Sequence, residues 1–381
     1  MKVLTRLFML TTVLAHSTEG QERYSPPANV GKPSAIYATT NRAFTGIPSI
    51  AVTRGGRLWA TWYAGKTPGE NENNYVVLAT SGDDGATWKE VVVTDPDYEG
   101  ERRSFDPNVW YSPDGKICLF WADGKRTGLY NETWMLEVTD AERSDSRHTA
   151  PRYVTCGVAL CKPVVLSTGE WSLPVCTWKT PPSTKMAVST DHGKTWLVRG
   201  GCQVPPAAME WDEPMMVERK DGSLWMLVRT NYGLGESFSH DRGRTWTEVA
   251  PSPIAHTVSR FFITRLSSGN LLLVKHGPIK TKTGRSHLMA FVSRDDGATW
   301  SDGLMLDERK GVSYPDGQQA ADGRFYLVYD YNRYSDRQIL MAVFCEEDVQ
   351  AGKDVSGNVR LRLVVSQGSG GQFPSTYKGA K

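Results

Sequence analysis

The chain has 381 residues, of which 39% are hydrophobic and 10% are aromatic, so it can bury a sizeable core and wholesale disorder is excluded. Its 44 Lys and Arg residues nearly balance its 42 Asp and Glu residues, which leaves a formal net charge of +2. A dedicated nucleic-acid-binding protein usually carries a large basic excess, so this balance argues against nucleic acid as a partner.

The first twenty residues have the layout of an export signal. Lys2 and Arg6 make a basic start, an apolar run covers residues 7–15, and small and polar residues follow at 16–20. A membrane-spanning helix needs about 20 apolar residues, so this run is too short, and no later stretch is apolar enough to span a bilayer. We expect residues 1–20 to be a cleaved signal peptide, although a buried N-terminal strand is an alternative. The mature protein would then be secreted or periplasmic, or lysosomal in a eukaryote.

Six cysteines permit up to three disulfides in an exported chain. Three of them lie inside apolar, strand-like runs and are expected to be buried thiols: Cys118, Cys176 and Cys345. Cys156 and Cys161 lie close together in the sequence and could pair with each other or with Cys202.

One short pattern, Ser-x-Asp-x-Gly-x-Thr-Trp, recurs four times along the chain. The copies span residues 81–88, 189–196, 239–246 and 293–300. Apolar runs precede the copies and predict strands, while Asp and Gly favour a tight turn. Each copy is therefore predicted to be a β-hairpin turn, with its Trp packed back onto the repeat.

A second pattern is a Gly that opens a strand rich in apolar and aromatic residues. Its six copies begin at Gly56, Gly115, Gly169, Gly222, Gly269 and Gly323. A repeating unit of about 50 residues with four short strands is typical of a propeller blade. The six units predict an all-β fold, a six-bladed β-propeller over residues 21–381, and disfavour a pair of β-sandwiches. The four hairpin motifs fall where the turn between third and fourth strands is expected.

Propeller geometry also predicts where a site would lie. The first strand of each blade lines the central channel, so the starts of these strands converge on one mouth. Counting back about nine residues from each repeat Gly, or from Gly55 in blade one, where two glycines adjoin, reaches these starts, at Gly46, Asp106, Leu160, Glu213, Arg260 and Tyr314. Four of the six are polar or ionisable where a purely structural strand would carry Val or Ile. We therefore predict a functional site at that mouth.

These features together resemble the sialidase (neuraminidase) superfamily, whose members include six-bladed exo-α-sialidases. The repeated hairpin motifs are similar to the Asp boxes of that family. The segment from Glu213 to Arg229 resembles the one that carries the catalytic Glu and the second Arg of an arginine triad. Arg285 is placed like the third triad Arg, and Tyr314 is placed like the nucleophile. The resemblance implies a glycosidase with a carbohydrate substrate and with no need for a metal or other cofactor.

The chemistry of sialic acid explains this residue set. Its anomeric carbon bears a carboxylate, which would repel the carboxylate nucleophile used by most retaining glycosidases. A phenol is neutral, and a neighbouring Glu can take its proton during attack. Arginines hold the substrate carboxylate, and an acid protonates the leaving oxygen. The resemblance thus implies Tyr314 as nucleophile, Glu213 as base, and Arg229 with Arg285 as the clamp.

The chain departs from the family pattern at the first triad arginine. Sialidases carry Phe-Arg-Ile-Pro at the start of blade one, whereas residues 44–48 read Phe-Thr-Gly-Ile-Pro. Gly46 therefore stands where that Arg is expected. Arg42, Arg103 or Arg260 could reach in to replace it, although Arg260 could instead pair with Asp106 across the channel.

The second departure concerns the acid. Sialidases place an Asp in the loop before the first Asp box, but residues 69–73 read Gly-Glu-Asn-Glu-Asn. Glu70, Glu72 or Asp106 could supply the proton. Three blade-five histidines, His256, His276 and His287, could also line the pocket.

Three functions fit these observations. The first is an exported retaining exo-glycosidase that removes a terminal acidic sugar, sialic acid or a related one. The second is a glycosidase or lyase of the same fold that acts on another acidic sugar, such as a uronic acid. The third is a carbohydrate-binding propeller without catalysis. The sequence leaves the oligomeric state open.

Overall fold

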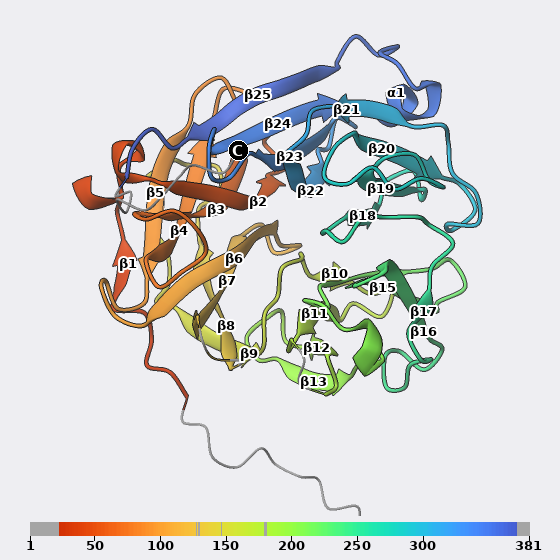
Figure 1. Cartoon of the computed structure of the whole chain (residues 1–381), viewed down its shortest axis with the longest axis horizontal. Coiled ribbons are helices and arrows are strands. Elements are labelled where there is room, and N and C mark those ends of the chain that lie inside the picture. Colours follow the sequence, from red (N-terminus) through yellow and green to blue (C-terminus); the bar gives the residue numbers. More distant parts are fainter. Residues whose placement is uncertain (1–22, 127, 129, 146, 179–180, 372–381) are drawn as a thin grey trace, which may run out of the picture.

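Six antiparallel sheets surround a central axis in the computed structural model of the chain (Figure 1). The structure describes residues 23–126, 128, 130–145, 147–178 and 181–371. The sheets are the blades of the six-bladed β-propeller predicted from the Gly repeat. The predicted signal peptide, residues 1–20, lies outside the described residues.

Each blade is built from four strands that follow one another in the chain, and blade one gains β1 as an outer fifth strand paired with β5. The strands of blades one to three are β1 (Asn29–Gly31), β2 (Phe44–Val52), β3 (Leu58–Gly65), β4 (Asn74–Ser81) and β5 (Lys89–Asp95); β6 (Arg102–Tyr111), β7 (Ile117–Lys125), β8 (Asn131–Val138) and β9 (Arg152–Cys156); and β10 (Val164–Val165), β11 (Trp171–Cys176), β12 (Thr184–Ser189) and β13 (Leu197–Gly200).

The strands of blades four to six are β14 (Pro214–Glu218), β15 (Leu224–Thr230), β16 (Gly233–Ser239) and β17 (Ala250–Pro251); β18 (Phe262–Arg265), β19 (Leu271–His276), β20 (Leu288–Ser293) and β21 (Leu304–Asp307); and β22 (Val312–Gln319), β23 (Phe325–Tyr331), β24 (Gln338–Phe344) and β25 (Arg360–Gln367). The helical segments are α1 (Glu346–Ala351), which follows β24, and the 3-10 turns Ala35–Tyr37, Thr39–Asn41 and Pro206–Ala208.

The Asp boxes connect the third and fourth strands of blades one, three, four and five, as predicted. In the blade-four box, Asp241 accepts hydrogen bonds from the backbone N–H of Thr245 at 2.9 Å and from its hydroxyl at 2.6 Å. Ser239 Oγ accepts from the backbone N–H of Gly243 at 2.8 Å. Gly243 has a φ of 84°, which glycine adopts without strain. The box therefore closes the hairpin with its own side chains.

The hydrophobic core lies between neighbouring blades. One cluster joins Trp59 and Tyr63 of blade one to Leu119 and Trp121 of blade two. Every residue of β2, β3 and β4 is buried, because these strands have a neighbouring blade on each face. Long buried runs, rather than alternating ones, are the expected pattern for strands covered on both faces.

A buried carboxylate ties four blades together at the axis. Asp316, on β22, is fully buried, and its Oδ1 accepts hydrogen bonds from Ser49 Oγ at 2.7 Å and from the backbone N–H of Ile50 at 3.1 Å. The Lys162 ammonium donates to the same oxygen, and Arg260 Nη2 lies 3.5 Å from Oδ2. Arg260 therefore pairs with Asp316 and not with Asp106, so that alternative from the sequence was wrong.

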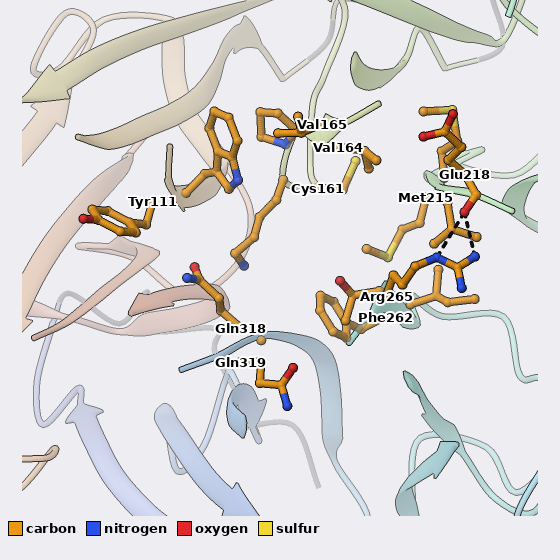
Figure 2. A pocket seen from close by; sticks show the side chains of 18 of the residues that line it. Tyr111, Cys161, Val164, Val165, Met215, Glu218, Phe262, Arg265, Gln318 and Gln319 are labelled. Atoms are coloured by element: carbon orange, nitrogen blue, oxygen red, sulfur yellow. Dashed lines mark hydrogen bonds between the residues drawn. The ribbon is translucent and has the colours of Figure 1, made fainter. Parts of the chain in front are cut away.

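A cavity of about 470 Å³ lies where the inner strands end (Figure 2). Tyr111, Met215, Phe262 and Gln318, which come from four blades, contribute to its lining and are labelled in Figure 2. It is a separate cavity from the one at the starts of these strands, described below. Its lining is largely apolar.

All six cysteines are free thiols, so the pairing of Cys156 with Cys161 or Cys202 does not form. Cys161 and Cys202 pack into two different hydrophobic clusters, which keeps their sulfurs apart. Cys118 and Cys176 are buried as predicted, whereas Cys345 is only partly buried. Within the part of the chain that the structure describes, no helix has both the length and the apolar character to cross a bilayer.

Replacing Asp316 by Ala should destabilise the propeller by about 3–5 kcal/mol, because Lys162 and Arg260 would keep buried charges without their partner. Urea unfolding of the purified protein measures this loss. Ser49→Ala is the matched control. It removes one hydrogen bond to the same oxygen and the bond that Ser49 Oγ accepts from the backbone N–H of Val109 at 3.0 Å, but it leaves no charge without a partner, so it should cost less, about 1–3 kcal/mol. Equal losses in the two variants would contradict the role assigned to Asp316.

Candidate active site

A cavity of about 350 Å³ opens where the inner strands begin. Its lining combines tyrosine, carboxyl and guanidinium groups with a few apolar side chains. The lining residues are Ile47, Glu70, Arg103, Asp106, Trp178, Trp211, Glu213, Arg229, Arg285, Tyr314, Arg333 and Tyr334. The cavity therefore brings together seven of the candidates named from the sequence, whereas others lie outside its lining: Arg260, Arg42, Glu72, His256, His276 and His287.

A repeated backbone distortion aims side chains into this cavity. Ile47, Asp106 and Tyr314 each precede a proline on the first strand of their blade, and their φ angles are 57°, 47° and 53°. The strand pairing shifts register at each of these places. Such bulges re-aim a side chain, and strained left-handed residues concentrate at functional sites. Ile47, and not Gly46, is thus the blade-one counterpart of Asp106 and Tyr314.

The spacing from Glu213 to Arg229 is explained by a hairpin. Strands β14 and β15 are antiparallel with Pro214 opposite Val228, which sets Glu213 opposite Arg229. The backbone N–H of Arg229 donates to the carbonyl of Glu213 at 3.0 Å. The two side chains therefore leave neighbouring strands side by side at the cavity.

Tyr314, Glu213 and Arg229 form a closed set of contacts. The Tyr314 hydroxyl donates to Glu213 Oε1 at 2.9 Å. Arg229 Nη1 donates to the same carboxylate oxygen at 3.0 Å and to the Tyr314 hydroxyl oxygen at 3.1 Å. Each of these three residues is at most 5% exposed. This places a phenol in direct contact with a potential proton acceptor.

Burial and charge determine the protonation state of Tyr314. Burial raises the pKa of its phenol well above the ordinary value, and the neighbouring Glu213 carboxylate raises it further. The guanidinium groups of Arg229, Arg333 and Arg285 lower that pKa but do not cancel the rise. The resting phenol is therefore neutral and carries the proton that Glu213 accepts as a hydrogen bond.

Arginines dominate the charge of the cavity. The guanidinium carbons of Arg333 and Arg285 lie 4.9 and 5.7 Å from the centroid of the Tyr314 ring. Arg103 is 8% exposed, and its Nε and Nη1 are buried with no hydrogen-bond partner among the described residues. With Arg229, four guanidinium groups face three carboxyl groups. The cavity is suited to an anionic ligand.

The two cavity carboxyls proposed as acids have different environments. Burial, followed by the charge of Glu70, raises the pKa of Asp106 to about 8, so Asp106 is protonated at neutral pH. Glu70 accepts a hydrogen bond from Arg333 Nη1 at 3.0 Å and its side chain is 36% exposed. Glu72 is exposed and lies outside the cavity lining.

Of the arginines that could replace the missing triad arginine, some line the cavity and others are held elsewhere. Arg42 is fully buried and binds both carboxylate oxygens of Glu90 at 2.7 Å, so it does not reach the cavity. Arg260 is held by Asp316. Arg103 does line the cavity, and so does Arg333, which the sequence analysis missed.

Three further lining residues, besides Arg333, were not foreseen: Ile47, Trp178 and Tyr334, whereas Trp211 was expected at the rim from its place just before Glu213. Trp178 and Trp211 form an edge-to-face pair with centroids 5.2 Å apart, and Trp211 is 42% exposed at the rim. These residues, Ile47 apart, lie in loops outside the inner strands, where the repeat gives no position to count from. The blade-five histidines His256 and His276 are buried and stack on each other outside the cavity lining.

The sequence matches the BNR repeat-like domain family over residues 56–327, which is more than half of the chain. The protein belongs to this family. Its fold is a BNR propeller of the sialidase type, in agreement with the resemblance seen in the sequence. A search of curated protein sequences finds no match.

Solved structures with the same fold include enzymes that act on different sugars. The Hadza microbial sialidase Hz136 is 18% identical with a TM-score of 0.64, over 81% of this chain and 67% of that one. The NanB sialidase of Streptococcus pneumoniae is 13% identical with a TM-score of 0.63, over 85% and 71%. An α-L-arabinanase of Penicillium chrysogenum is 12% identical with a TM-score of 0.55, over 86% and 100%. At identities this low, the similarity shows the shared propeller fold alone. The substrate has to be inferred from the residues of the site.

Asp106→Asn should change the pH dependence of stability. Because the pKa of Asp106 rises from 3.8 to about 8 on folding, the unfolded chain ionises first and the wild type loses stability between about pH 4 and pH 8. The neutral amide avoids this loss. The melting temperature of the variant, relative to wild type, should therefore rise across that range and level off above it.

Thermal melts at several pH values test this expectation, with the exposed Asp302→Asn as control. A difference between Asp106→Asn and wild type that does not change with pH would contradict the raised pKa of Asp106.

Proposed function

We propose that this BNR propeller is a retaining exo-glycosidase that removes a terminal acidic sugar, sialic acid or a related one, from a glycan outside the cytoplasm. The observation that carries this proposal is the contact of the Tyr314 hydroxyl with Glu213 at 2.9 Å, beside Arg229. Most retaining glycosidases use two carboxylates, and a tyrosine nucleophile is the exception found in sialidases. The anionic character of the expected substrate agrees with the excess of guanidinium groups.

In the first step the Tyr314 oxygen attacks the anomeric carbon. The bond from that carbon to the leaving oxygen breaks, the phenol proton moves to Glu213, and an acid gives its proton to the leaving oxygen. Water then attacks the anomeric carbon of the glycosyl–tyrosine and gives a proton to the deprotonated acid, which restores it. The bond to Tyr314 breaks, Glu213 returns the proton to the phenol oxygen, and two inversions give overall retention. Arg229 touches both Tyr314 and Glu213, so it can stabilise the phenolate character that develops during attack.

We assign the acid role to Glu70 and leave Asp106 as a neutral hydrogen-bond donor. The Glu70 side chain is 36% exposed, so it is open to a leaving group that extends into solvent, whereas Asp106 is only 6% exposed. Arg103, with its unpartnered nitrogens, is positioned to bind another polar group of the sugar. A binding propeller without catalysis would have no use for a phenol in contact with a carboxylate.

Tyr314→Phe should lower kcat on a cleavable acidic glycoside by about 10³-fold or more, because the nucleophilic oxygen is lost while the ring remains. A panel of fluorogenic glycosides, including a sialoside, a glucuronide and an arabinofuranoside, measures the loss and identifies the sugar. Tyr331→Phe, outside the cavity lining, is the matched control. Full activity in Tyr314→Phe would refute the proposed nucleophile, and cleavage of the arabinofuranoside alone would refute the acidic substrate.

Glu70→Gln should slow glycosides with alkyl leaving groups by about 10²–10⁴-fold and spare those with acidic phenol leaving groups, which need no protonation. Comparing kcat for a lactoside-linked and an aryl-linked substrate of the same sugar measures this difference. Asp106→Asn should affect both substrates to the same extent. The reverse pattern would assign the acid to Asp106.

A further inference from the structure

We propose that Arg333, from the turn that follows β23 in blade six, takes the place of the blade-one arginine that sialidases carry, and that Gly46 is the residue that makes room for it. This inference rests on the proposed function, because it assumes an acidic sugar as the ligand. It adds the position of the carboxylate on that sugar. The substrate would carry its carboxylate on the carbon that Tyr314 attacks.

The space at Gly46 is already filled by Arg333. A Cβ built on Gly46 would lie 2.2 Å from Arg333 Cδ and 2.6 Å from Cγ, distances that real Cβ atoms do not tolerate. Gly46 is not among the glycines with positive φ, so its backbone conformation suits any residue. Space alone therefore demands glycine here, and an arginine at 46 could not coexist with Arg333 in its present position.

The stem of Arg333 is held firmly while part of its guanidinium is left available. Its Nε lies 3.6 Å from Asp330 Oδ2, an oxygen that also accepts the backbone N–H of Ile47 at 2.9 Å. Its Nη1 donates to Glu70 at 3.0 Å. Among the described residues, no acceptor for a hydrogen bond from its Nη2 is found, although the side chain is only 8% exposed. A buried guanidinium with a spare donor facing the cavity is prepared for an acceptor from a ligand.

Three guanidinium groups then surround one phenol. Arg229 contacts the Tyr314 hydroxyl at 3.1 Å, and Arg285 and Arg333 lie 5.7 and 4.9 Å from the centre of the ring. A carboxylate that meets all three must sit close to the Tyr314 oxygen. A sugar with its carboxylate on the attacked carbon satisfies this condition, whereas a uronic acid carries its carboxylate on C5, which the ring oxygen separates from the attacked carbon.

Contact with that carboxylate would also change the partner of Glu70. The substrate would compete with Glu70 for Arg333 and bring a negative charge close to it. Glu70 would then be without its guanidinium partner while the substrate is bound. A purely structural Arg333 would instead keep tying Asp330 to Glu70 whatever occupied the cavity.

The test compares two ligands that differ in one group, 2,3-didehydro-2-deoxy-N-acetylneuraminic acid and its C1 amide, by calorimetry on the full-length protein. Wild type should prefer the acid. Arg333→Gln should weaken binding of the acid by about 10–100-fold, the range expected for a lost charged hydrogen bond, and leave the amide unchanged. Arg309→Gln, an arginine stacked on Tyr331 away from the cavity, should change neither.

Gly46→Ala gives a second measurement that removes no charge. Its methyl group must displace Arg333, so it should reduce the preference for the acid in the same direction. The proposal is overturned if wild type binds both ligands equally, or if Arg333→Gln weakens both ligands alike or neither. A preference that depends on Arg333 in a protein that cleaves no acidic glycoside would support this inference and refute the proposed catalysis. Cleavage with a preference that survives Arg333→Gln would do the opposite.

Discussion

The buried carboxylate of Asp316 is the constraint on which the geometry of the site depends. It receives hydrogen bonds or charges from blades one, three and five, and it lies two residues beyond Tyr314 on the same strand. Burying a carboxylate is costly unless its partners are all in place, so the three blades must meet β22 in one arrangement. That arrangement fixes the bulge at Tyr314 and hence the direction of its phenol. The same ion pairs that stabilise the centre of the propeller thus set the position of the proposed nucleophile.

The chemistry of the cavity follows from burying opposite charges near one another. Burial favours the neutral phenol of Tyr314 and the protonated carboxyl of Asp106, and Arg229 is held between Tyr314 and Glu213. The remaining guanidinium groups make the cavity positive, which attracts an anion and stabilises negative charge on the attacking oxygen. A single feature, a surplus of arginine around a neutral phenol, therefore accounts for both the preferred ligand and the proposed reaction.

The sequence predicted what is periodic and missed what is not. Six Gly-led strands and four Asp boxes located the blades, because each repeat is formed by local hydrogen bonds such as those of Asp241 and Ser239. Counting back from the repeat also reached Asp106, Glu213 and Tyr314. In blade one, two adjacent glycines left the count uncertain by one residue, which led to Gly46 instead of Ile47. Arg260 was misplaced because counting gives a residue's height along the channel and not the partner, Asp316, that holds its side chain.

Arg333 shows why the rest of the site could not be found by counting. It lies on a turn after the second strand of blade six, a position that carries no repeated motif. It reaches the cavity because the ring closes there: the backbone of Ile47 in blade one donates to Asp330, and the backbone of Thr45 donates to the carbonyl of Arg333. At this closure, residues nearly 300 positions apart share one small volume. Arg333 fills that volume in this chain, and no side chain fits at Gly46 beside it. Gly46, which in the sequence indicated the loss of an arginine, therefore leaves the space through which Arg333 reaches the cavity.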